Sequence, residues 1–171
     1  MTYSRNLFPS LLLSLALVLF ACQEIEPDTD ARDNAAAQNE ELAMQYIEAY
    51  NTQDLQTLSA VLADPMSVNG VEEDRDEFLT LVEGYWGSFP DITLDPTHIV
   101  SADDYVTIRI EFSATGEGEF AGHDIDGREV RSTEIILFGV NDGQLAEYWY
   151  NWDELGFWEQ LGVLESPFPE Q

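Results

Sequence analysis

The chain has 171 residues and carries 34 acidic side chains against six basic ones, which gives a formal net charge of -28 at pH 7. A surface this negative repels the phosphates of nucleic acids, so a nucleic-acid partner is excluded, and an anionic membrane surface would repel the chain as well. The length is sufficient for one domain with one hydrophobic core.

The first 21 residues have the composition of a secretory signal peptide. Arg5 is the one charged residue, and an apolar run follows that is shorter than the about 20 residues that span a bilayer. The run ends in Leu19-Phe20-Ala21-Cys22, which resembles the lipobox of bacterial lipoproteins. Cys22 is the only cysteine, so no intrachain disulfide can form. We therefore expect export and lipid attachment at Cys22, with the domain on the extracytoplasmic side of the cell membrane or outer membrane; the alternative is an ordinary signal peptide with an incidental cysteine.

Residues 22–38 are acidic and rich in alanine and show no apolar periodicity, which predicts a flexible tether. The domain is expected over 39–166, followed by a short tail at 167–171.

All six basic residues are arginine. The many acids and the absence of lysine favour adaptation to high salt, where screening weakens repulsion between carboxylates, over a merely acidic secreted protein.

Three helices are expected in the first half of the domain. Apolar spacings of three and four predict a helix over 39–51, and Asp54 is placed to cap a second short helix that ends at Asp64-Pro65. A short strand is expected at 66–68. A third helix, opened by Asp74 or Asp76, should end before Phe89-Pro90.

The second half of the domain reads as strands over 91–101, 104–115, 128–140 and 144–153, with a short helix after them. Alternation of apolar and polar residues is clearest in 104–113. Helices followed by antiparallel strands indicate the α+β class.

The segment 147–162 combines aromatic residues with a single acid at the end of a strand that follows an Asn-Asp-Gly turn. Because side chains alternate along a strand, two faces are predicted. One would place an acid in an apolar cavity, and the other would form a buried dimer surface unless helices or the tail cover it. The first face holds Trp149, Asn151 and Asp153, and the second holds Tyr148, Tyr150 and Trp152.

The order of short motifs along the domain resembles a known family. The motifs are Phe89-Pro90-Asp91, Gly118-Glu119-Phe120-Ala121-Gly122, Gly127-Arg128-Glu129-Val130, Asp142-Gly143, Glu147-Tyr148-Trp149, Asp153, Gly156 and Gln160-Leu161-Gly162. Together they resemble the SnoaL-like polyketide cyclases, or ester cyclases, of the NTF2-like superfamily, over roughly 39–164.

The resemblance implies an NTF2-like cone-shaped α+β barrel in which N-terminal helices pack on a curved antiparallel sheet around an apolar pocket, and a homodimer. It also implies a general acid/base role for Asp153. Many relatives carry a histidine two residues before the first glycine of the G-x-F-x-G motif, where this chain has Gly116. His123, just past the motif, is the residue that could take its place.

Trp149, Asn151, Tyr46 and Tyr50 are the candidate pocket-lining residues, although an aromatic residue on a helix or strand is as often plain core. Asp153 has its own alternative, because an acid just before a helix commonly serves as the N-cap. No metal site and no cofactor is expected, since one histidine in a glycine-flanked loop does not make a ligand set.

The expected function is that of a membrane-anchored, cofactor-independent cyclase or isomerase that acts on a small apolar or amphipathic molecule by acid/base chemistry. The alternative is a lipoprotein that binds a small ligand without chemistry or serves as a dimeric interaction module. The absence of the family histidine favours the alternative, and one fold can host both.

Overall fold

The computed structural model describes residues 29–165, so the predicted signal peptide, Cys22 and the tail lie outside the described residues. The elements follow the α+β order expected from the sequence. In chain order they are α1 (Thr29–Asn51), α2 (Leu55–Val61), β1 (Leu62–Val68), β2 (Val71–Glu73), α3 (Arg75–Ser88), β3 (Thr93–Ala102), β4 (Tyr105–Thr115), β5 (Glu119–Phe120), β6 (His123–Asp124), β7 (Glu129–Asn141), β8 (Gln144–Trp152) and α4 (Glu154–Gln160). Within 29–165, no helix is long and apolar enough to cross a membrane.

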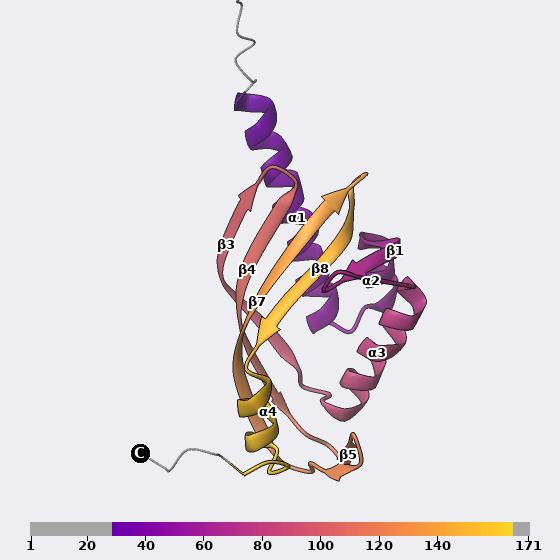
Figure 1. Ribbon diagram of the computed structural model, residues 1–171, viewed down its shortest axis with the longest axis vertical. Helices are drawn as coiled ribbons and strands as arrows, with labels where there is room; N and C mark the ends of the chain where they lie inside the picture. The colour runs from indigo at the N-terminus through magenta and orange to yellow at the C-terminus, as the bar shows by residue number, and fades with distance from the viewer. Residues whose placement is uncertain (1–28, 166–171) are drawn as a thin grey trace, which may run out of the picture.

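The main sheet has six strands in the order β2-β1-β8-β7-β4-β3, and helices pack on one face of it (Figure 1). Its long central strands are antiparallel, as predicted, but β1 pairs with β8 in parallel. The sheet is curved and does not close, so the expected cone is an open one rather than a sealed barrel. Strands β5 and β6 form a separate small hairpin.

Three helices begin at aspartates whose side chains accept hydrogen bonds from the first turn. Asp54 accepts from the Thr57 amide at 3.0 Å, Asp74 from the Asp76 amide at 2.9 Å, and Asp153 from the Gly156 amide at 3.0 Å. These bonds satisfy amides that have no partner inside a helix, and the negative charge suits the helix N-terminus. The predicted caps at Asp54 and Asp74 are thereby confirmed.

Two predicted boundaries differ from the structure. Helix α1 starts at Thr29, so residues 29–38, which the composition assigns to a flexible tether, are helical in their backbone. Helix α2 ends at Val61 rather than at Asp64-Pro65, and β1 begins at Leu62, four residues before the predicted strand. Tertiary contacts stabilise both segments: the Ser101 hydroxyl donates a hydrogen bond to the Ala36 carbonyl, and Leu62 pairs with Leu145.

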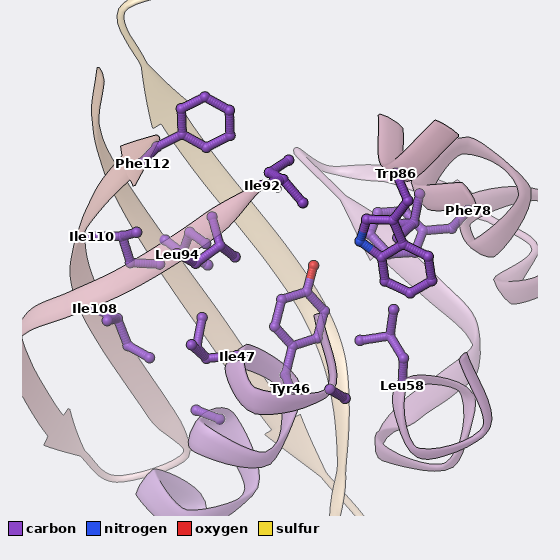
Figure 2. Packing of buried hydrophobic residues seen from close by; sticks show 14 of the residues in the cluster. Tyr46, Ile47, Leu58, Phe78, Trp86, Ile92, Leu94, Ile108, Ile110 and Phe112 are labelled. Carbon is purple, nitrogen blue, oxygen red and sulfur yellow. The ribbon is translucent and has the colours of Figure 1, made fainter. Parts of the chain in front are cut away.

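The hydrophobic core lies between the sheet and the helices. Most of its strand residues come from the inner face of β4 and β7, and most of its helix residues from α1, α2 and α3. Figure 2 shows Tyr46 of α1 between two groups of side chains, with Ile92 and Leu94 on one side and Trp86 of α3 on the other. The Tyr46 hydroxyl points into the space between them.

Candidate active site

A cavity of about 180 Å³ lies between α1, α3 and the inner face of the sheet, and α4 borders one end of it. Its wall contains nine aromatic residues among sixteen. Leu81 and Tyr150 line it and are also 59% and 39% exposed, so they lie at its mouth. The full lining is Tyr46, Tyr50, Val68, Glu73, Phe78, Leu81, Val82, Tyr85, Ile92, Leu94, Phe112, Glu134, Tyr148, Tyr150, Trp152 and Phe157.

Glu134 places a carboxyl group in the wall of this cavity. It lies on β7, where its neighbours across the sheet are Ile110 of β4 and Trp152 of β8. Burial raises the pKa of the Glu134 carboxyl from 4.5 to about 7, because the apolar surroundings disfavour the charged form. Within residues 29–165, no ion pair or hydrogen bond to this carboxyl is present to offset that cost. The group is therefore poised to gain or lose a proton near neutral pH.

Four tyrosines surround Glu134 in the cavity. Burial raises the pKa of Tyr46, Tyr50, Tyr85 and Tyr148, and the negative charge of Glu134 adds to the effect on each of them. The rings of Tyr46 and Tyr148 are neighbours, with their centroids 5.9 Å apart. The phenols consequently stay protonated at neutral pH and can donate hydrogen bonds to an oxygen of a bound molecule.

Of the residues singled out from the sequence, Tyr46 and Tyr50 line the cavity as expected. Trp149 and Asn151 do not. The Trp149 ring lies on the other face of β8, over Gly70, and its indole nitrogen donates to Glu147 at 2.9 Å. The two faces of β8 are thus the reverse of the predicted ones. The face with Tyr148, Tyr150 and Trp152 lines the cavity below the helices of the same chain, with Tyr150 at the mouth.

A β-bulge lies directly before these residues on β8. On β8, Leu145 pairs with Val140 and Glu147 with Gly139, so Ala146 has no partner across the sheet. One extra residue moves every later side chain to the opposite face. Leu145 points into the core, and so do the even-numbered aromatic residues beyond the bulge rather than the odd-numbered ones.

Asp153 lies outside the cavity lining. It is exposed, it caps α4, and it borders an open polar depression that it shares with Asp95, Glu111 and Arg131. The helix-cap interpretation describes its place in the fold. A catalytic role for Asp153 stays a prediction that this geometry does not support.

His123 is exposed on the small hairpin and does not reach the cavity lining. The neighbouring backbone explains why position 116 is glycine, since a Cβ there would clash with the Ile125 carbonyl oxygen. No side chain, and therefore no histidine, fits there without moving the loop. Within 29–165, no cluster of three or more His, Cys, Asp or Glu is placed to hold a metal ion.

Comparison with known proteins identifies the family. Residues 40–161 match the family model of the SnoaL-like polyketide cyclases. The chain belongs to this family. Among curated protein sequences, none matches it significantly.

Several solved structures share its fold. The proposed hydroxylase AclR from Streptomyces galilaeus is 26% identical with a TM-score of 0.69, over 77% of this chain and 89% of that one. The proposed polyketide cyclase IdmH from Streptomyces antibioticus is 28% identical with a TM-score of 0.66, over 74% and 99%. A SnoaL-like polyketide cyclase from Agrobacterium tumefaciens is 19% identical with a TM-score of 0.64, over 72% and 98%. The proposed activities of the first two differ, so the fold alone does not specify the reaction.

Proposed function

We propose that the domain is a cofactor-independent acid/base catalyst, a cyclase or isomerase, in which Glu134 transfers the proton. The observation that carries the proposal is a half-buried carboxyl in the wall of an aromatic cavity, with no ion pair among residues 29–165 and a pKa of about 7. A base with this pKa is half ionised at neutral pH, where it can both accept a proton and return it.

The reaction class follows from the groups around Glu134. The carboxylate removes a proton from a carbon next to a carbonyl group, and the electron pair moves onto the carbonyl oxygen. Tyr46, Tyr50 and Tyr148 line the same cavity, and their hydroxyls can donate hydrogen bonds to that oxygen as its negative charge develops. Return of the proton to another carbon gives an isomer. Attack of the enolate carbon on a second carbonyl gives a ring, and the oxygen of that carbonyl then takes the proton from Glu134.

The cavity volume supports a small substrate. A cavity of about 150 Å³ holds a benzene-sized molecule, and most drug-sized ligands occupy roughly 300–1,000 Å³. The 180 Å³ here fits one ring or a short chain. A molecule with several fused rings, such as an aromatic polyketide, would have to extend through the mouth beside Leu81 and Tyr150.

Deuterium exchange tests the proposal without knowledge of the substrate. Small enolisable ketones are incubated with the protein in heavy water, and incorporation next to the carbonyl is followed by NMR. We expect acceleration that increases with pH through about 7, because the ionised Glu134 is the base. Glu134→Gln should reduce the acceleration by a factor on the order of 10² to 10⁴.

Asp153→Asn is the matched control, because it removes the same charge from the exposed cap. We expect it to leave the exchange rate unchanged. Loss of exchange in Asp153→Asn with full activity in Glu134→Gln would overturn the proposal and restore the assignment made from the sequence.

We also propose that Cys22 carries a lipid that holds the exported domain at a membrane. Metabolic labelling with a fatty-acid probe tests this: the label should enter the wild-type chain and not Cys22→Ser.

The homodimer stays a prediction as well. The outer face of the sheet exposes Val100, Ile135 and Trp149, and light scattering in solution would give the mass of the assembly.

A further inference from the structure

The charged groups in the cavity wall are all negative. They are Glu73 of β2 and Glu134 of β7, and none of the arginines in the described chain lines the cavity. An anionic ligand would meet two carboxylates with no opposite charge to bind it. The wall therefore disfavours anions and is suited to a neutral or a positively charged molecule.

A cation would supply the partner that Glu134 lacks. A carboxylate buried without a hydrogen bond or an opposite charge is costly, and a nearby positive charge favours its ionised form. A neutral ligand leaves that cost in place. Glu134 therefore favours a positively charged ligand over a neutral one.

The aromatic wall favours the same choice. Tyr50, Tyr148 and Trp152 are among the nine aromatic residues that line the cavity. The faces of such rings attract organic cations, and aromatic cages with nearby acids are a known way of binding quaternary ammonium groups. The net charge of -28 adds a long-range field that raises the local concentration of cations.

We infer that the cavity binds an organic ammonium ion, a tertiary or quaternary amine with a small apolar body, through Glu134 and the aromatic wall. This inference rests on the proposed function in so far as it concerns the same cavity. It does not require that the bound molecule react.

Choline and its uncharged isostere, in which a quaternary carbon replaces the nitrogen, are the probes. Their binding to the full chain is measured by titration calorimetry at pH 7. We expect choline to bind roughly tenfold more tightly or better, since the Glu134 carboxylate and the aromatic faces together attract its positive charge and neither attracts the isostere in this way. Part of a proton should be released on binding, because the cation favours the ionised form of Glu134. The measured heat should therefore depend on the ionisation enthalpy of the buffer.

Glu134→Gln should abolish most of the preference for choline and leave binding of the isostere unchanged. Glu111→Gln is the matched control, since Glu111 is exposed beside Arg109 and lies outside the cavity lining. It changes the net charge by the same amount and should keep the preference. Both variants are checked for folding by their thermal unfolding midpoints.

Equal binding of the two probes, no choline binding at millimolar concentrations, or a preference that survives Glu134→Gln would overturn the inference. A choline preference in a protein that catalyses no deuterium exchange would support the inference and refute the proposed catalysis. Deuterium exchange in a protein without a choline preference would support the proposed catalysis and refute the inference.

Discussion

The raised pKa of Glu134 makes a specific prediction about stability. In the unfolded chain this carboxyl ionises near its ordinary value of 4.5, and in the folded chain near 7. Below pH 4.5 both states hold the proton, so the group has no effect. Between pH 4.5 and 7 the unfolded state loses its proton first, and stability falls as the pH rises. Above pH 7 the penalty is complete, and at about 1.4 kcal/mol per pKa unit it amounts to about 3 kcal/mol.

Glu134→Gln removes this penalty because the amide stays neutral at every pH. We therefore expect the variant to match the wild type near pH 4 and to exceed it by up to about 3 kcal/mol at pH 8. Urea denaturation at constant ionic strength, repeated from pH 4 to 8 for both proteins, gives the difference in unfolding free energy.

The difference between the two proteins is the relevant quantity, because the other carboxylates contribute equally to both. Glu111→Gln, which changes an exposed acid of the same type, should show a difference of nearly zero at all pH values. If the difference for Glu134→Gln were flat between pH 4 and 8, Glu134 would not be desolvated and the site would have to be abandoned.

Three further predictions concern stability. Asp153→Ala should lower the unfolding free energy by about 1 kcal/mol through loss of the bond to the Gly156 amide, and Asp153→Ser should recover most of it; no change would contradict the cap. Phe157→Ala should cost about 3–5 kcal/mol by urea denaturation, because this ring is 1% exposed and packs edge-on against Trp152 at 4.8 Å; a loss below 1 kcal/mol would contradict tight packing there. Raising potassium chloride from dilute to molar concentration should increase stability by screening the net charge of -28, and equal stability would refute adaptation to salt.

Local patterns were sufficient to predict most of the elements. Asp54 and Asp74 lie just before runs with helical periodicity, and both cap helices. The alternation of β4 predicts its inner face correctly, since Val106, Ile108 and Ile110 are fully buried. These features depend on neighbours within a few residues, and for that reason one sequence is enough to find them.

The faces of β8 depend on a partner strand. Nothing in the residues 144–152 marks Ala146 as a bulge, because the bulge exists only in the pairing with β7. Alternation within 147–153 separates two faces but does not show which one is buried, and the acid at Asp153 indicated the wrong face. The parallel pairing of β1 with β8 is likewise a long-range feature, and the short apolar stretch at 66–68 gives no indication of it.

A signal for Glu134 was present in the sequence. Val130, Ile136 and Phe138 have the same parity on β7 and are buried, and Glu134 occupies the same face. An acid on the inward face of a mostly apolar strand is unusual, because burying a charge is costly unless it has a role or a partner. Such a position indicates a functional group more directly than a cluster of aromatic residues does.

Glu134 and Asp153 show why the place of an acid, and not its motif, decides what it can do. Glu134 pairs with Trp152, the residue directly before Asp153, so the two acids are close in the sheet and differ in environment. Asp153 is exposed and its carboxylate holds the first turn of α4. Glu134 lies in the wall of an aromatic cavity, and no ion pair within residues 29–165 offsets its charge. A proton-transfer group needs a carboxylate whose charge is destabilised, so that it gains and loses a proton near neutral pH. A helix cap needs a carboxylate that stays charged, so one carboxylate cannot serve both roles well.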